Sequence, residues 1–355
     1  MGICRLAAIA LLFILSTLSV MAQTGPPASN AVDHEIQSGT ASIRQGNYAE
    51  AKRHFEKAEG MGGPPSAEIN SGIAIAELEM DHFDAVRQRE ATVLQLVSTD
   101  RDRAEAYNLI GNSWLRQAAQ STSNIGMLKS AEESFQRAAK LDPLFDAAYF
   151  NLGNALLRQK REDDAAVAFK NFIAAAEKNP AYDQNMPIAP QSPAPAFKIA
   201  DNQGHLFSSD SLRGRFVLLD FWATWCAPCM RALPAMRQLA HYFPPSKFIL
   251  VSVSENGADQ QGWKKFTTLH NMDWTQLWDN NLELYYKFGL APRPDGIPRY
   301  VLIDSNGFVR RIYGGTDHFG FVIGQIAKTV AAAATSQPAN SSSPPAPEKP
   351  KPQPQ

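Results

Sequence analysis

Hydrophobic positions divide the chain into a helical half and a half that alternates strands with helices. Between residues 31 and 178, small and aromatic side chains recur at steps of three and four, which places them on one face of a helix. Between residues 195 and 334, short apolar runs are followed by amphipathic stretches, as in a mixed α/β sheet. We therefore predict an all-α domain followed by an α/β domain.

The helical half repeats its own pattern. Small residues let neighbouring helices approach closely, and the aromatic residues pack on one helix face. The unit around Gly72 fits poorly because Phe83 and Ala85 fall out of register. A plain helical bundle is the alternative interpretation. The matching positions are Gly39, Ala51, Phe55 and Ala58; Gly153, Ala165, Phe169 and Phe172; and, once extra residues near 121–129 are allowed, Gly111, Ala131, Phe135, Ala138 and Pro143.

This spacing resembles the tetratricopeptide repeat of 34 residues, which is also visible in the stretch 148–154 and in Leu141-Asp142-Pro143. The resemblance implies a solenoid of stacked helical hairpins whose concave surface binds a protein or peptide partner. The histidines of this half are isolated from one another, so we interpret them as surface or capping residues and not as ligands.

The α/β half begins its regular pattern with a run that is apolar on both alternating faces, Phe216–Trp222, which predicts a central strand covered on both sides. Between the last two predicted strands of this half, Asn306-Gly307 supplies the positive φ that a hairpin turn needs. The other predicted elements are a helix at 226–242, a strand at 248–253, a helical region at 259–270, and strands at 300–303 and 308–313.

Three segments fall outside these domains. Residues 179–194 are rich in proline and predict an extended linker that lets the domains move independently. Residues 335–355 combine proline with serine, glutamine and lysine, a composition typical of a disordered tail. Residues 1–22 have a basic start, a short apolar run and a cleavage pattern at Val20-Met21-Ala22, which predict a signal peptide. We expect a periplasmic or secreted protein, with an uncleaved N-terminal anchor as the alternative.

Charge and cysteine content narrow the function. The formal net charge is −1, and it becomes more negative when Arg5 leaves with the signal peptide, which argues against a nucleic-acid partner. Loss of Cys4 with that segment leaves Cys226 and Cys229 as the remaining cysteines. An exported protein that relies on disulfide staples uses more cysteines, so a lone close pair indicates redox chemistry.

The two cysteines fall where a predicted strand ends and a predicted helix begins. Free backbone N–H groups and the helix dipole favour negative charge there, so the first sulfur is stabilised as a thiolate. We expect Cys226 to be the partly exposed nucleophile, and Cys229, which is less exposed, to resolve the mixed disulfide. Ala227 and Pro228 form the active-site loop, and a first helical turn tolerates proline.

Other uses of a close cysteine pair fit the sequence less well. A structural zinc needs a second pair of ligands, and covalent haem needs histidine where Met230 stands. An inert structural disulfide is the remaining alternative, although so short a loop constrains little of the unfolded chain. We expect no metal and no cofactor apart from the redox-active pair Cys226 and Cys229.

Three separated motifs carry a resemblance to a known family. The segment 217–229, Leu233-Pro234 and Gly296-Ile297-Pro298 resemble the thioredoxin superfamily, in particular its exported TlpA-like branch, over about residues 195–334. The resemblance implies a thioredoxin fold with the redox pair at a helix start. It also implies that the Ile297–Pro298 bond is cis and faces the cysteines, where these two residues and the rim residue Trp225 contact the substrate. Core packing is the alternative interpretation of Trp225.

Asp220 matches the acidic residue that thioredoxins bury beneath the second cysteine. Its apolar neighbours predict a raised pKa, suited to moving the proton of Cys229, and a carboxylate that reaches solvent is the alternative. Many exported relatives instead place a glutamate at the position of Ala232. Arg299 and the long loop 291–295 also depart from the family pattern, so we expect a reshaped substrate groove.

Together these observations predict an exported thiol–disulfide oxidoreductase. We expect it to reduce a disulfide of a protein partner that the repeats recruit, with electrons from an unknown donor such as a membrane reductase. The alternatives are a binding scaffold with a vestigial redox domain and a thiol peroxidase. The peroxidase fits poorly because Ala223 stands where such enzymes need threonine.

Overall fold

The computed structural model describes residues 27–62, 64–122, 124–179, 192–279, 281–290, 296–314 and 319–336. The expected signal peptide, nearly all of the expected linker and the expected tail from residue 337 onward lie outside the described residues. Thr335 and Ser336, which we assigned to the tail, end a helix. In the part of the chain that is described, no helix is long and apolar enough to cross a membrane.

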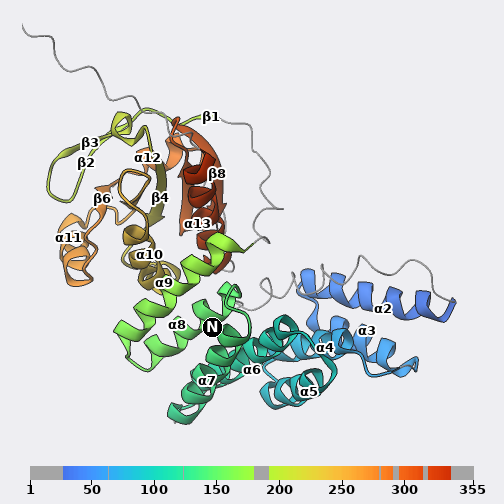
Figure 1. The fold of residues 1–355 in the computed structure, drawn as a ribbon. Coiled ribbons are helices and arrows are strands. Elements are labelled where there is room, and N and C mark those ends of the chain that lie inside the picture. The colour runs from blue at the N-terminus through green and yellow to red at the C-terminus, as the bar shows by residue number, and fades with distance from the viewer. Residues whose placement is uncertain are drawn as a thin grey trace, which may run out of the picture.

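The first domain consists of helices that pack against one another in chain order (Figure 1). This is the helical, tetratricopeptide-like architecture that the sequence predicts. The domain includes α2 (Pro27–Arg44), α3 (Tyr48–Gly60), α4 (Ala67–Glu79), α5 (Phe83–Leu96), α6 (Asp100–Gln120), α7 (Ile125–Leu141), α8 (Asp146–Arg158) and α9 (Glu162–Lys178).

Glycines that face phenylalanine rings explain the repeated sequence pattern. The ring of Phe55 is fully buried between two helices, and a Cβ at Gly39 or Gly72 would lie 2.9 or 2.6 Å from its atoms. The same contact recurs between Gly153 and Phe169, at 2.7 Å. Gly72 therefore contacts the phenylalanine of the preceding hairpin, in contrast to Gly39 and Gly153, which contact that of their own.

The second domain is built on a mixed sheet with strand order β1-β8-β7-β4-β5-β6. Its central strand, β4, runs parallel to β5 and antiparallel to β7, so the predicted mixed α/β sheet is confirmed. The strands are β1 (Ser192–Pro193), β4 (Phe216–Trp222), β5 (Phe248–Ser254), β6 (Thr275–Trp278), β7 (Arg299–Ile303) and β8 (Phe308–Gly314), and β2 (Lys198–Ala200) pairs with β3 (Leu206–Ser208) apart from them; the α-helices are α10 (Ala227–Tyr242), α11 (Gln260–Leu269), α12 (Glu283–Lys287) and α13 (Phe319–Ser336).

The two domains meet through the last repeat helix. Helix α9 packs against α10 and α13, and its buried Phe169, Phe172 and Ile173 belong to the same hydrophobic cluster as the core of the sheet. The hydroxyl of Tyr242 on α10 donates a hydrogen bond of 3.0 Å to Glu177 of α9. The expectation that the domains move independently is therefore wrong, because the helix before the linker packs into the core of the α/β domain.

Candidate active site

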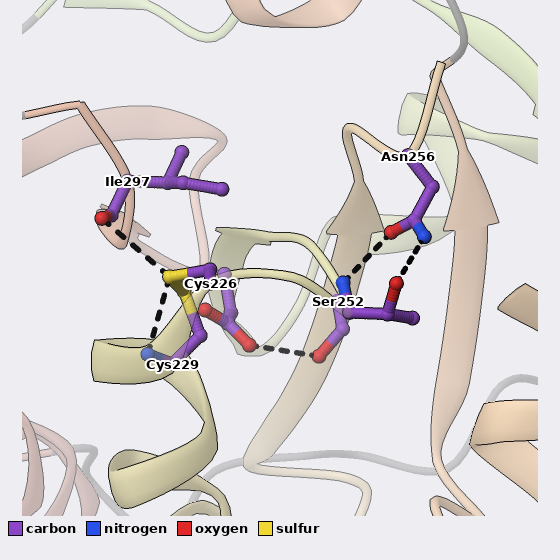
Figure 2. The surroundings of a disulfide bond; sticks show 7 residues. Cys226, Cys229, Ser252, Asn256 and Ile297 are labelled. Carbon is purple, nitrogen blue, oxygen red and sulfur yellow. Dashed lines mark hydrogen bonds between the residues drawn. A yellow bond between two sulfur atoms is a disulfide. The ribbon is translucent and has the colours of Figure 1, made fainter. Parts of the chain in front are cut away.

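The redox pair lies at the start of α10, directly after the loop that follows β4. Cys226 is the N-cap residue of this helix, and Cys226 and Cys229 form a disulfide (Figure 2). The Sγ of Cys226 accepts a hydrogen bond of 3.2 Å from the backbone N–H of Cys229. A backbone donor and the positive end of the helix dipole both stabilise negative charge, so the geometry favours a thiolate on Cys226 after reduction.

The expected difference in exposure between the two cysteines is wrong for the disulfide form. Cys226 is 3% and Cys229 6% exposed, so both sulfurs are buried. The segment before β7 covers them, with the carbonyl oxygen of Ile297 at 3.6 Å from the Sγ of Cys226 (Figure 2). A disulfide sulfur carries no proton, so these two atoms are in simple contact here. In the dithiol the same carbonyl is placed to accept from a Cys226 thiol.

The segment that faces the cysteines has the predicted backbone. The Ile297–Pro298 peptide bond is cis, and β7 begins at the next residue. Trp225 is 68% exposed, which excludes core packing as its role. The loop 291–295 lies outside the described residues. The site thus has the cis-proline segment against Cys226, and an exposed aromatic side chain at the residue before it.

Arg299 follows the cis-proline but is buried against a neighbouring strand. It pairs with Gly314 of β8, and a Cβ at that glycine would lie 1.5 Å from its guanidinium. The absence of a side chain at residue 314 therefore gives the arginine its space across the sheet.

Asp220 is buried beneath the second cysteine, so the alternative of a solvent-reaching carboxylate is wrong. Burial raises the pKa of Asp220 to about 7, and a hydrogen bond of 3.0 Å from the hydroxyl of Ser252 opposes this rise. Asp220, Cys229 and Tyr300 line one cavity of about 10 Å³, close to the size of a single water molecule. The carboxyl group and the resolving cysteine therefore line the same small cavity.

A second contact from β5 fixes the loop that precedes Cys226. The backbone N–H of Thr224 donates to the side-chain oxygen of Asn256 at 2.9 Å (Figure 2). The hydroxyl of Ser254 donates to the same oxygen at 3.0 Å. Sequence reasoning missed this clamp. A signal was present, because Ser252 and Ser254 place polar groups at alternate positions of the otherwise apolar β5, and Asn256 continues this alternation just past its end.

Comparisons with known proteins agree with this geometry. Residues 190–312 match the model of the AhpC/TSA family, and residues 125–180 match that of the tetratricopeptide repeat. The chain is 29% identical over 135 residues to "Thiol-disulfide oxidoreductase ResA" of Geobacillus thermodenitrificans, which covers 38% of this chain and 75% of the relative. It is 26% identical over 129 residues to the protein of the same name from Bacillus subtilis, covering 36% and 69%.

Among solved structures, a putative thiol:disulfide interchange protein DsbE from Chlorobium tepidum is 26% identical. This similarity covers 41% of the present chain and 99% of the other, with a TM-score of 0.37.

The α/β domain is thus a thioredoxin-like thiol–disulfide oxidoreductase domain with a Cys226–Cys229 pair. Its residues 190–312 are similar to the AhpC/TSA family, and residues 125–180 at the end of the helical domain are similar to the tetratricopeptide repeat.

Proposed function

We propose that this protein is an exported reductant of protein disulfides and that the repeat domain recruits its partner. The observation that carries the redox role is the hydrogen bond from the Cys229 N–H to the Sγ of Cys226 at the start of α10, opposite the cis-proline segment. This arrangement stabilises the thiolate of Cys226. It also positions Cys229 to attack Cys226 in the mixed disulfide and to displace the sulfur of the partner.

The reaction consists of two exchanges. The Cys226 thiolate attacks one sulfur of the partner disulfide, forms a mixed disulfide and releases the other partner sulfur as a thiolate. Cys229 then loses its proton and attacks the Sγ of Cys226, which releases the second partner thiolate and forms the Cys226–Cys229 disulfide. Two electrons pass to the partner, and its two thiolates take up protons. A separate reductant, such as a membrane reductase, must then restore the dithiol.

Asp220 is the base in the second exchange. It lines the same small cavity as Cys229, and its pKa of about 7 lets it accept a thiol proton near neutral pH and release it afterwards. No other cofactor enters either step. Trp225 is exposed directly before Cys226, and the Ile297–Pro298 segment covers the Sγ of Cys226, so they are the residues we propose to contact the partner chain.

The domain junction supports recruitment next to the redox pair. A cleft of about 470 Å³ is lined by Glu162, Ala166 and Phe169 of α9 on one side and by Met230, Arg237 and Leu269 of the α/β domain on the other. Thr224, two residues before Cys226, also lines it. A partner segment held by the last repeat therefore lies beside the reacting sulfur, which raises its effective concentration there.

Reduction of a probe disulfide by the full mature chain tests the redox role. Insulin is a suitable probe, because its reduction is followed by precipitation of the free B chain. Cys226→Ser should lose roughly 10³-fold or more in rate. Cys229→Ser should still attack and accumulate a mixed disulfide, detectable by intact mass. Activity of Cys226→Ser, or an adduct that forms through Cys229 when both cysteines are present, would contradict the assignment.

A further inference from the structure

A buried tryptophan is hydrogen-bonded to the serine that contacts Asp220. The indole Nε1 of Trp274 lies 2.9 Å from the Oγ of Ser252, and this Oγ lies 3.0 Å from the Oδ2 of Asp220. All three side chains are buried. Ser252 pairs with Asp220 in the β4–β5 register, whereas Trp274 precedes β6. In Figure 2 the dashed line from Ser252 ends on the carboxylate oxygen of Asp220.

The chemistry of the indole fixes the direction of this chain of hydrogen bonds. A tryptophan N–H donates and cannot accept, so the Ser252 oxygen is the acceptor of the first bond. The single hydroxyl proton of Ser252 is then free to donate to Asp220. A serine oxygen has two acceptor lone pairs, and Trp274 occupies one of them; without Trp274 both would be open to accept a hydrogen bond from a neutral Asp220. A hydroxyl that already accepts a hydrogen bond is also a stronger donor.

We propose that Trp274 and Ser252 are positioning residues that hold the Oδ2 of Asp220 as an acceptor and leave Oδ1 to take the proton of Cys229. This inference rests on the proposed function of Asp220 as the base. Neither residue touches the reacting sulfur; both act through the carboxyl group.

The other described residues that line the cavity beside Asp220 carry no positive charge. Helix α10 contributes Cys229 to the cavity, and β7 contributes Tyr300. Burial raises the pKa of Tyr300 well above its ordinary value, so the phenol stays neutral across the working range. Among the described residues, no Lys, Arg or His lines this cavity. The Ser252 hydroxyl therefore tunes the proton affinity of Asp220 without the help of a cation.

The test is an NMR titration of the Asp220 carboxyl carbon in the oxidised full-length protein, with the signal assigned by its loss in Asp220→Asn. Ser252→Ala should raise the apparent pKa of Asp220 by roughly one pH unit, because a donor to the charged form is removed. Ser252→Thr keeps the hydroxyl and should restore the wild-type value. Trp274→Phe should shift the pKa in the same direction by a smaller amount.

Trp263→Phe is the matched control, since Trp263 is a buried tryptophan of α11 whose indole N–H has no acceptor among the described residues. It should leave the titration unchanged. An unshifted carboxyl in Ser252→Ala, or equal shifts in Trp274→Phe and Trp263→Phe, would overturn the proposal.

A second readout is the pH profile of mixed-disulfide resolution, which should move in parallel with the titration. The titration needs no substrate, so an inactive protein with the expected shifts refutes only the proposed function. An active protein without the shifts refutes only the positioning role of Trp274 and Ser252.

Discussion

Glu35 of the helical domain and Asp220 of the α/β domain are both buried carboxylates, and their surroundings shift their pKa values in opposite directions. Glu35 in α2 accepts hydrogen bonds from His54 and Lys57, and these partners lower the pKa of Glu35 to about 2. Asp220 in β4 is hydrogen-bonded by a neutral serine, and burial raises its pKa to about 7. A paired carboxylate stays charged and holds helices together, whereas an unpaired one becomes a group that exchanges protons near neutral pH.

The two domains also differ in what their cores contain. In the repeats, fully buried phenylalanine rings lie against glycines, and the contact determines how closely two helices approach. In the α/β domain, Ser252 and Asp220 occupy positions inside the sheet where an apolar residue would pack at lower cost. The repeat contacts should therefore govern stability, and the buried polar groups of the sheet should govern chemistry.

Removal of the repeat domain should change stability more than any substitution, because α9 packs into the cores of both domains. A fragment of residues 195–334 loses the cover that α9 gives to α10 and α13. We expect it to be less stable than a fragment of residues 146–334 by on the order of 5 kcal/mol, measured by urea unfolding. Equal stabilities would mean that the junction contributes no packing and that the linker does separate the domains.

Asp220→Asn should change the pH dependence of stability. The folded pKa lies above the unfolded one, so the wild type loses stability as pH rises from about 4 to 7, while the amide variant does not. At pH 8 the variant should be more stable by up to about 4 kcal/mol, and below pH 4 the two should agree.

Glu35→Gln should change the pH dependence of stability in the opposite direction. The folded pKa of Glu35 is lowered, so its charge contributes stability above about pH 4.5 that is lost as pH falls toward 2. We expect this variant to be less stable than wild type at neutral pH and equal to it in acid, by thermal unfolding across the same buffers. The same sign for both variants would remove the distinction between the two carboxylates.

Asp220→Asn should also slow the resolution of the mixed disulfide by roughly 10²-fold, because general-base help to Cys229 is lost while the shape is kept. Formation of the mixed disulfide by Cys226 should change much less. Stopped-flow measurement of both phases separates them. Unchanged resolution between pH 6 and 8 would make Asp220 a bystander.

Gly153→Ala should destabilise the protein by about 2 kcal/mol, because the new methyl group overlaps the ring of Phe169. Gly126→Ala is the control: a Cβ there meets nothing within 4 Å, and alanine is the better helix former, so stability should hold or rise. Thermal unfolding measures both. The rate of thiol–disulfide exchange by the folded Gly153→Ala protein should equal that of the wild type, since the repeats contribute no reacting group.

Local patterns predicted the parts of the structure that depend on neighbours in sequence. Strand β4 matches its predicted bounds because its apolar run is continuous, and α10 begins within one residue of its predicted start because the cysteine motif marks the cap. The cis-proline was predicted through family resemblance, since few X-Pro bonds are cis. The short strands β1, β2 and β3 were missed because two or three residues carry no readable period.

The remainder depends on contacts between distant segments. The carbonyl oxygen of Ile297, 71 residues away, contacts the Sγ of Cys226, and no pattern near the cysteines encodes this contact. Trp274 meets Ser252 across a 22-residue separation, and α9 joins the second core through apolar residues that a repeat helix would carry in any case. Such approaches follow from the packed fold and not from local sequence.

The central claim is that Cys226 is the attacking sulfur because the start of α10 stabilises its thiolate. The direct test is alkylation of the reduced full-length protein with limiting iodoacetamide at about pH 6, followed by peptide mapping of the adduct. Cys226 should be labelled first, at a pH where an ordinary thiol with a pKa near 8.5 is almost entirely protonated. Preferential labelling of Cys229, or equal labelling of the two, would contradict the account.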